Sequence, residues 1–343
     1  MNKNIAKKTV WVITEGLIGT ENQCIGVANA LNFPYQVYRV RLREPWRSLS
    51  PWLKFENKLS FYDLPAPPWP DILITAGRKA IAASRYIKKL SPHSFTVHLQ
   101  DPKISPAQFD MVAVPRHDRL RGKNVVVTTA NPNKITADVL EAARAEFAGI
   151  FAPLPGPRIG VLIGGATKKS APTAENIDIL LKILRQLKAT HSLMITTSRR
   201  TGAELTEKLE TALSPPLTGS YPIFFYNAYR GTSRINGQDT SSSNPYLGIL
   251  AWADVMIATN DSTSMLSEAA TSGIGSYVIP FVGATARQSQ LIKNLMDYGA
   301  LRGGNELSAA ISAGALESWD FPPLQDAAHI ADQVAAEIRK VCL

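Results

Sequence analysis

The stretch TNDSTSMLSEAATSG combines hydroxyl, amide and carboxyl side chains at the point where a predicted strand meets a predicted helix. The apolar run ADVMIA precedes it and SYVIP follows it, which is typical of a strand, a turn, a helix and a second strand. Asn260 or Asp261 is expected to cap the helix. The backbone amides of Ser262, Thr263 and Ser264 would then point out of its positive end, where an anion such as phosphate is stabilised.

A carboxylate follows one turn further along the same helix. Glu268 stands four residues after Ser264, so it lies on the same helix face, about 6 Å along the axis. A carboxylate repels phosphate but accepts hydrogen bonds from a diol. This spacing predicts a diphosphate at the helix start and a ribose beside Glu268. The alternative interpretation is an ordinary capped helix with an exposed glutamate.

Two other predicted strands end in turns that could bind phosphate. LIGGATKKS places two glycines, a threonine and lysines after one strand, and ITTSRRTG places hydroxyl residues and two arginines after another. Glycine lets a backbone approach phosphate closely, while amides, hydroxyls and cations satisfy its oxygens. The candidates in these turns are Gly164, Gly165, Thr167, Lys168, Ser198 and Arg199. Neither GxGxxG nor GxxxxGK[ST] occurs, which disfavours a dinucleotide fingerprint and a P-loop.

Alternating strands and helices must position these turns. TVWVIT, YQVYRV, DILITAG, SFTVHLQ, FDMVAVP and KNVVVTT are the strand candidates of the first half. RIGVLIGG, HSLMITTS, YPIFFYN, ADVMIATN and GSYVIPF are those of the second half. Strands that are apolar on both faces, alternating with amphipathic helices such as ENIDILLKILRQL, predict the α/β class with doubly wound parallel sheets. Ligands of such sheets bind at the carboxyl ends of the strands.

The segment APLPGPR, Ala152 to Arg158, is the predicted boundary between two domains, because its three prolines and glycine cannot continue the preceding helix. Residues 1–152 and 153–343 are expected to form two Rossmann-like domains facing across a cleft. The last helix, near Leu324 to Val341, is a candidate to pack back on the first domain. Asn236 to Asn244, NGQDTSSSN, is predicted to be a low-complexity loop.

An insertion rich in aromatic and basic residues, Glu44 to Pro70, interrupts the first half. Its aromatic residues are Trp46, Trp52, Phe55, Phe61 and Trp69. Aromatic rings among cations suit a membrane surface, where the rings bury their bodies and the cations meet lipid phosphates. A core excursion with proline turns is the alternative.

Composition narrows the class of protein. The chain has 343 residues and a net charge of +9, which favours an acidic partner such as a phosphorylated molecule or an anionic membrane surface. Nucleic acid is disfavoured because the basic residues are scattered and no nucleic-acid motif occurs. No apolar run is long enough for a transmembrane helix or a signal peptide, so a cytoplasmic protein is expected, peripheral to the inner membrane face at most. The two cysteines, Cys24 and Cys342, have no metal-ligand spacing.

Over nearly its whole length the chain resembles the bacterial relatives of the plant "elongated mitochondria" fission protein. The resemblance rests on VWVITEGLIGTENQCIGVANAL, LITAGRKA, LQDPK, FDMVAVPRHDRLRGKNVVVT, LIGGATKKS, ITTSRRT and NPYLGILAWADVMIATNDSTSMLSEAATSG, in that order. These relatives are similar to glycosyltransferases of the two-Rossmann B type. The resemblance therefore implies that fold, and with it a nucleotide-sugar donor and a glycan or lipid-linked acceptor.

The resemblance also implies roles for individual residues. Glu268 would take the ribose, Ser262, Thr263 and Ser264 the diphosphate, and Arg199 and Lys168 the remaining phosphate charge, with Gly164 and Gly165 lining the cleft. The acceptor would lie on the first domain, near Gly16, Gly19, Asn22, Gln23, Gly77 and Arg78.

Inverting sugar transfer needs a base for the acceptor hydroxyl and charge neutralisation of the leaving diphosphate. Glu15, after the first strand, is the candidate base, with Asp101 in reserve; their alternative readings are a helix cap and a turn residue. A retaining mechanism would need neither. No D-x-D motif occurs, so no metal cofactor is expected.

A metal-independent glycosyltransferase of cell-envelope polysaccharide or lipid-linked glycan assembly is thus the main hypothesis. A non-catalytic adaptor that binds proteins or membranes and a sugar-nucleotide epimerase are the alternatives.

Overall fold

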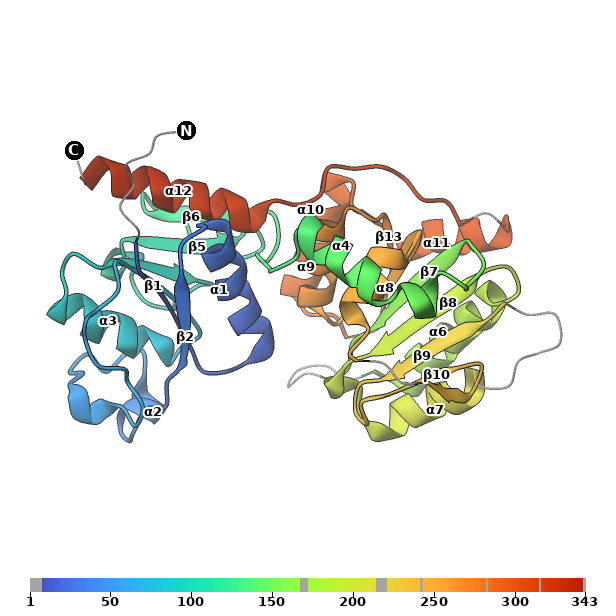
Figure 1. Cartoon of the computed structure of the whole chain (residues 1–343), viewed down its shortest axis with the longest axis horizontal. Coiled ribbons are helices and arrows are strands. Elements are labelled where there is room, and N and C mark those ends of the chain that lie inside the picture. The colour runs from blue at the N-terminus through green and yellow to red at the C-terminus, as the bar shows by residue number, and fades with distance from the viewer. Residues whose placement is uncertain are drawn as a thin grey trace. The chain divides into compact units, whose positions relative to one another are not determined.

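The computed structural model describes residues 8–166, 172–213, 221–240, 243–281, 283–314 and 316–341. The chain forms two compact units (Figure 1). The first unit comprises Met1–Lys134 and Gln325–Leu343, and the second comprises Ile135–Leu324.

The first unit is built on a parallel sheet with the strand order β2-β1-β3-β4-β5-β6. Its strands are β1 (Val10–Thr14), β2 (Tyr35–Arg39), β3 (Ile72–Ala76), β4 (Phe95–Leu99), β5 (Met111–Pro115) and β6 (Val125–Thr128). Its helices are α1 (Ile18–Ala30), α2 (Trp46–Leu49), α3 (Ala80–Leu90) and α12 (Asp326–Val341). Each of these strands matches an apolar run that the sequence predicts to be a strand.

Both faces of this sheet are covered, as the apolar strands require. Val10 and Val12 of β1 face α1 and α12, whereas Trp11 and Ile13 face α3. Side chains alternate between the two faces of a strand, so a strand that is apolar at every position must be buried on both sides. Cys24 of α1 lies in this core; Cys342 lies outside the described residues.

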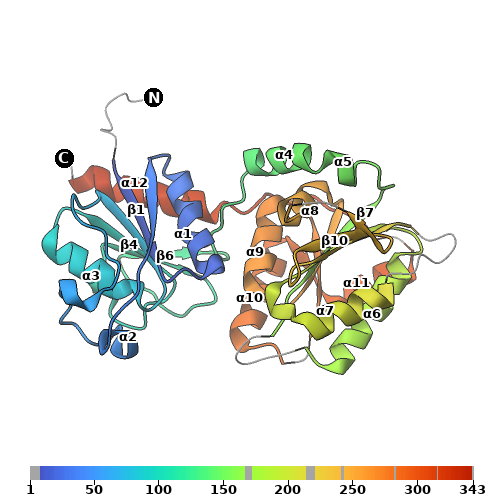
Figure 2. The same cartoon turned by 60° about the horizontal axis from the view of Figure 1, so that its bottom comes forward.

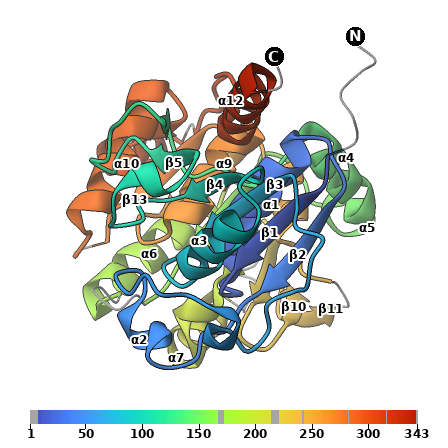
Figure 3. The same cartoon turned by 90° about the vertical axis from the view of Figure 1, so that its left-hand side faces the viewer.

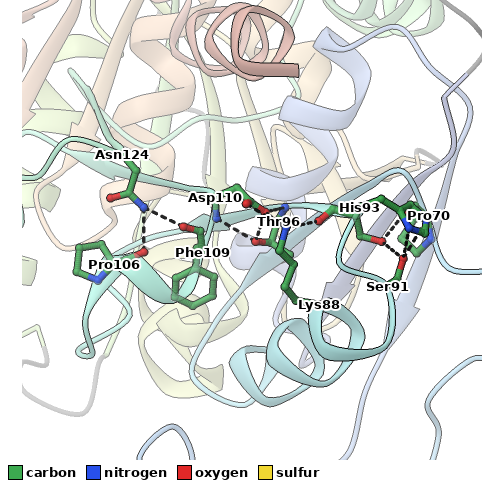
Figure 4. A network of polar contacts seen from close by, with 10 residues as sticks. Pro70, Lys88, Ser91, His93, Thr96, Pro106, Phe109, Asp110 and Asn124 are labelled. Carbon is green, nitrogen blue, oxygen red and sulfur yellow. Dashed lines mark hydrogen bonds and ion pairs between the residues drawn. The ribbon is translucent and has the colours of Figure 1, made fainter. Parts of the chain in front are cut away.

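A polar network closes the amino end of the sheet (Figure 4). The Asp110 carboxylate accepts from the Thr96 backbone N–H at 2.7 Å, from the Thr96 hydroxyl at 2.8 Å and from the Lys88 Nζ at 2.8 Å. The Asn124 side chain donates to the carbonyls of Pro106 and Phe109, both at 2.9 Å. These groups tie together the starts of neighbouring strands, on the opposite edge from the turns that the sequence singles out.

The second unit has an eight-stranded sheet with the order β11-β10-β9-β8-β7-β12-β13-β14. Its strands are β7 (Arg158–Ile163), β8 (Ser192–Thr197), β9 (Ile223–Asn227), β10 (Thr232–Ile235), β11 (Gln238–Thr240), β12 (Val255–Thr259), β13 (Ser276–Ile279) and β14 (Leu301–Arg302). Its helices are α4 (Ala137–Glu146), α5 (Ala148–Phe151), α6 (Ala174–Leu187), α7 (Ala203–Leu213), α8 (Tyr246–Trp252), α9 (Thr263–Ser272), α10 (Ala286–Tyr298) and α11 (Gly304–Ser312). Neighbouring strands are parallel along the series β9, β8, β7, β12, β13 and β14.

The prediction of a loop at Asn236 to Asn244 is wrong in its first part. Strands β10 and β11 form an antiparallel hairpin there, and β10 also pairs with β9. Asn236 and Gly237 form its two-residue turn with φ of 51° and 83°. Asn-Gly is a strong signal for such a turn, because both positions need positive φ.

The boundary between the units precedes the proline-rich segment on which the sequence prediction rests. Helices α4 and α5 belong to the second unit, and α4 lies alongside α8 (Figure 2). The Trp252 indole donates to the Arg144 carbonyl at 2.9 Å, and the Arg144 guanidinium lies 4.8 Å from the Trp252 ring centroid. Phe151 packs edge-on against Phe224 at 4.9 Å. This packing fixes α4 to the second unit, so Ala152 to Arg158 is a connection within it.

The last helix, α12, belongs to the first unit, on the sheet beside α1 (Figure 1). Ile330 and Val334 are buried in the first unit's core. The Asp326 carboxylate accepts from the backbone N–H groups of Thr129 at 3.0 Å and Ala130 at 2.8 Å. None of the helices among the described residues has the length and apolar character needed to cross a bilayer.

Candidate functional site

The candidate site of the second unit lies where its strand order reverses. From β7 the chain moves outward to β8 and β9, and it later returns to place β12 on the other side of β7. In parallel α/β sheets, ligands bind at the carboxyl ends of the two strands that flank this reversal. Those ends carry Gly164 and Gly165 after β7, and Asn260 to Ser262 after β12.

The glycine pair after β7 is required by close packing. The Gly164 N–H donates to the Thr259 hydroxyl at 2.9 Å, and the Gly165 N–H donates to the Asp261 carboxylate. A Cβ on Gly164 would overlap the Asp261 carboxylate, and one on Gly165 would overlap the backbone between Arg200 and Thr201. The turns after β7, β8 and β12 therefore meet at these two residues.

Asp261 is a buried part of this junction and not a helix cap. Burial raises the pKa of its carboxyl, and hydrogen bonds together with the Arg200 charge act in the opposite direction. Asn260 also fails to cap the helix, since its side chain exchanges hydrogen bonds with the Phe281 backbone, both at 3.1 Å. The predicted capping role of these two residues is wrong because each serves tertiary packing.

Ser262 is the N-cap of α9. Its hydroxyl accepts from the Met265 N–H at 3.5 Å. Thr263 and Ser264 occupy the first turn, whose amides have no acceptor within a helix. Arg200 Nη2 donates to the Ser262 hydroxyl at 3.4 Å. The N-terminus of α9 and the Arg200 guanidinium therefore lie next to each other, and both stabilise a bound anion.

The structure favours Arg200 over Arg199 as the cation of this site. Both arginines are exposed on the short 3-10 helix Arg199–Thr201. Ser198 caps that helix, and the Thr201 hydroxyl bonds to Ser198 and to the Gly164 carbonyl. Because the 3-10 turn rotates successive side chains apart, only Arg200 reaches Ser262 in the described contacts. Thr167 and Lys168 lie outside the described residues.

Glu268 is turned into the protein. It is only 8% exposed, and it accepts a hydrogen bond from the Tyr246 hydroxyl of α8. Burial of the hydroxyl, followed by the charge of Glu268, raises the pKa of Tyr246 well above its ordinary value, so the tyrosine stays protonated and donates. The alternative of an exposed glutamate is therefore wrong.

Replacing Tyr246 by phenylalanine is expected to lower the free energy of unfolding by about 1–3 kcal/mol, because the buried carboxylate loses a donor. The difference from the wild type should shrink above a pH of about 10. Because the pKa of Tyr246 is higher in the folded protein than in the unfolded chain, its protonated form stabilises the fold fully at pH values below the pKa of the unfolded chain. This contribution is lost as the pH rises through the pKa of the folded protein. Urea unfolding at neutral and alkaline pH measures both effects. Tyr229→Phe, at an exposed tyrosine, is the control; equal stability of the two variants would contradict the role of Tyr246.

The first unit has an equivalent reversal between β1 and β3. Glu15 follows β1, and its carboxylate accepts from the Lys79 backbone N–H at 2.8 Å and pairs with the Lys79 Nζ at 3.1 Å. Gly77 follows β3 with φ of 89°, and its Cα faces the Glu15 carboxylate. Glu15 is thus fixed at the carboxyl edge of the first sheet. It does not cap α1, whose N-cap is Leu17, but its carboxylate accepts the backbone N–H of Lys79, the N-cap residue of α3.

The other candidates of the first unit have separate contacts. Asp101 follows β4 and accepts from the Lys103 backbone N–H at 2.9 Å and its Nζ at 2.6 Å. Gln23 is buried in α1 and accepts from the Gln100 side chain at 3.0 Å. Gly16 adopts φ of 83° between β1 and α1, and Gly19 and Asn22 lie within the first five residues of that helix. No hydrogen bond or ion pair among the described contacts joins Glu15 to Asp101.

Sequence reasoning missed Tyr246, and of the two arginines in the turn after β8 it assigned the phosphate charge to Arg199 instead of Arg200. A search of strand ends passes over Tyr246, because it lies on a helix before β12 and not after a strand. Arg200 is adjacent to Arg199 in the sequence, and only the geometry of the turn distinguishes them. The pair of arginines was itself the available signal.

Comparison with solved structures identifies the class of fold. A UDP-GlcNAc 2-epimerase from Neisseria meningitidis bound to UDP-GlcNAc matches with a TM-score of 0.50 and 10% identity, over 97% of this chain and 100% of that one. Arabidopsis thaliana UGT89C1 complexed with quercetin matches with a TM-score of 0.50 and 10% identity, over 98% and 100%. The chain therefore has the α/β fold of B-type glycosyltransferases and related epimerases.

The family follows from sequence. The family model described as Mitochondrial fission ELM1 matches residues 18–338, and the chain belongs to that family. The Mitochondrial fission protein ELM1 of Arabidopsis thaliana is 27% identical, and the match covers 98% of this chain and 92% of that protein. The resemblance stated from the motifs is confirmed.

Proposed function

We propose that this protein is a glycosyltransferase whose second unit binds a nucleotide-sugar donor. The supporting observation is that one strand-order reversal gathers the glycine pair, Arg200 and the start of α9, with Glu268 one turn further in. The fold is consistent with this function, because a UDP-GlcNAc 2-epimerase of the same architecture binds UDP-GlcNAc; the function itself is argued from the site.

Two positive features would hold the donor's diphosphate. The first-turn amides of α9 and the Arg200 guanidinium would bind the phosphate oxygens. Glu268 would bind the ribose hydroxyls, with Tyr246 fixing the orientation of its carboxylate. A carboxylate can accept hydrogen bonds from several donors at once, so a tyrosine and a diol can share it. On this proposal the charge of the leaving diphosphate is neutralised without a metal.

The first unit would hold the acceptor, with Glu15 as the base. An acceptor hydroxyl attacks the anomeric carbon, its proton passes to Glu15, and the bond from that carbon to the diphosphate breaks as the nucleoside diphosphate leaves. Asp101 remains the reserve, and a retaining reaction would use neither. A glycan or lipid-linked acceptor of envelope assembly is the proposed substrate class, with the protein peripheral on the inner face of the membrane.

Nucleotide binding tests the proposal. Thermal unfolding with UDP, GDP, CMP and their sugars should show a rise in Tm with one base, since a ligand at 100 times its Kd stabilises by about 2.7 kcal/mol. Arg200→Ala should weaken that nucleotide about ten- to a hundredfold, because a hydrogen bond to a charged group contributes about 1.5–3 kcal/mol. Arg199→Ala is the matched control and should change Kd by less than about threefold.

Three outcomes separate the alternatives. No stabilisation by any nucleotide would contradict the transferase and favour a non-catalytic adaptor. Binding of a sugar nucleotide with release of an isomer, in the absence of acceptor, would identify an epimerase. Equal losses in the Arg199 and Arg200 variants would place the phosphate elsewhere.

A further inference from the structure

Residues 49–62 of the first unit, here named the aromatic loop, expose large apolar side chains and bury a charged one. Five of its large apolar side chains are exposed to solvent, with Phe55 80% exposed, whereas Phe61 is buried. The neighbouring Glu56 side chain is only 4% exposed. The exposed apolar residues of the loop are Leu49, Trp52, Phe55, Leu59 and Tyr62. Single exposed apolar residues are ordinary, but a contiguous group of them marks a binding surface.

Other aromatic side chains of the insertion Glu44 to Pro70 pack into the protein. Phe61 is buried, and Trp46 and Trp69 pack against the core under α3. Trp69 lies edge-on to Trp11 at 5.8 Å. The alternative interpretation, an excursion into the core, therefore holds for these three residues. The exposed rings of the insertion are those of Trp52, Phe55 and Tyr62 in the aromatic loop.

A buried cation holds the loop from beneath. Arg85 of α3 donates to the carbonyls of Pro51 at 2.6 Å and Leu53 at 2.7 Å, and it pairs with Glu56. The aromatic loop follows α2 and lies beside α3 (Figure 3). Its backbone is anchored on both sides of Trp52, so the exposed rings are presented by a fixed framework.

The exposed charges of the loop are positive. Lys54 and Lys58 are exposed, and neither has an ion-pair partner among the described residues. The loop's one carboxylate, Glu56, is neutralised by Arg85. At the loop's end, the Arg43 guanidinium lies 4.6 Å from the Tyr62 ring centroid. Apolar side chains flanked by unpaired lysines are complementary to an anionic lipid surface, whose acyl region takes the rings and whose phosphates attract the cations.

The loop also borders the carboxyl edge of the first sheet. The Ser50 hydroxyl donates to the Arg78 carbonyl at 3.1 Å, and the Arg78 guanidinium lies 6.0 Å from the Trp52 ring centroid. The next residue, Lys79, binds Glu15. A surface that held Trp52 would therefore lie next to the turn that carries Glu15.

We propose that the aromatic loop inserts Trp52, Phe55 and Leu59 into an anionic lipid bilayer, with Lys54 and Lys58 on its phosphates. The inference rests on the proposed function in one respect, because it identifies the acceptor of that reaction as a molecule anchored in the bilayer. The docking itself depends only on the loop.

Vesicle flotation of the full chain tests the docking. The parent should float with vesicles in which phosphatidylglycerol is a third of the lipid, and at least tenfold less with phosphatidylcholine alone. Phe55→Ser and Leu59→Ser should each weaken binding about ten- to a hundredfold, since burying such a side chain contributes about 1.5–3 kcal/mol. Lys54→Gln with Lys58→Gln should weaken binding to the anionic vesicles about thirtyfold, at about 1 kcal/mol for each cation. Tyr229→Ser, at an exposed ring of the second unit, should leave flotation unchanged.

Circular-dichroism melts of every variant confirm that the fold is retained, which is expected because the substituted side chains are exposed. Failure of the parent to float with either vesicle, or undiminished flotation of the Trp52→Ser, Phe55→Ser and Leu59→Ser triple variant, would overturn the proposal. The nucleotide measurements are made on the full chain and report on residues of the second unit. A protein that floats without binding any nucleotide would therefore keep the docking and lose the transferase, and the reverse result would do the opposite.

Discussion

Gly165→Ala is expected to destabilise the second unit by about 1–3 kcal/mol and to abolish nucleotide binding. The added Cβ would overlap the backbone of Arg200 and Thr201. That backbone cannot move freely, because the Ala166 N–H donates to the Arg200 carbonyl at 3.0 Å and Thr201 bonds to the Gly164 carbonyl. Overpacking at a fixed contact has this cost, and the shift would displace the Arg200 guanidinium from α9. Urea unfolding and the nucleotide-dependent Tm measure the two effects.

Gly149→Ala is the matched control. Gly149 lies in α5, and nothing is within 4 Å of the position its Cβ would take. Alanine is favoured over glycine inside a helix by about 0.5–1 kcal/mol, so this variant should be as stable as the wild type or more stable. If both variants behaved alike and both bound nucleotide, the tight junction described around Gly165 would be contradicted.

Arg85→Met is expected to lower the free energy of unfolding by about 3–5 kcal/mol. The substitution leaves the Glu56 carboxylate buried without its counter-charge and removes the donor to the carbonyls of Pro51 and Leu53. Urea unfolding followed by tryptophan fluorescence measures the loss. Arg41→Met is the control, because the Arg41–Asp63 pair is exposed and such pairs contribute about 0–1 kcal/mol.

A second substitution separates the charge effect from the lost packing. Adding Glu56→Leu to Arg85→Met removes the uncompensated carboxylate and should recover part of the lost stability. A single variant that lost less than the Arg41 control would show that Arg85 does not anchor the loop.

Local pattern predicted most of the strands, because a buried parallel strand is apolar at every position. The hairpin of β10 and β11 was missed, since its strands are short and polar and only Asn236-Gly237 signals the turn. The boundary near Ala152 was inferred from prolines, which report where a helix ends and not which unit it packs on. Arg144 and Trp252 decide that question, and they are far apart in the sequence.

The candidate site was predictable in its location but not in its contacts. Residues after strands meet at one sheet edge, and this rule placed Gly164, Gly165 and the turn after β12 together. It could not tell that Asp261 bonds across to Gly165, which leaves Ser262 to cap α9. Likewise Glu268 could be assigned to a helix face, while its partner Tyr246 depends on the packing of α8.

The position of α12 bears on the order in which the protein can form. The first unit is assembled from two distant pieces of chain, whereas the second is continuous. As the polypeptide emerges from the ribosome, every residue of the second unit is available before Ile330 and Val334 can cover the other sheet. The nascent N-terminal piece must therefore keep an apolar face uncovered until α12 has been synthesised.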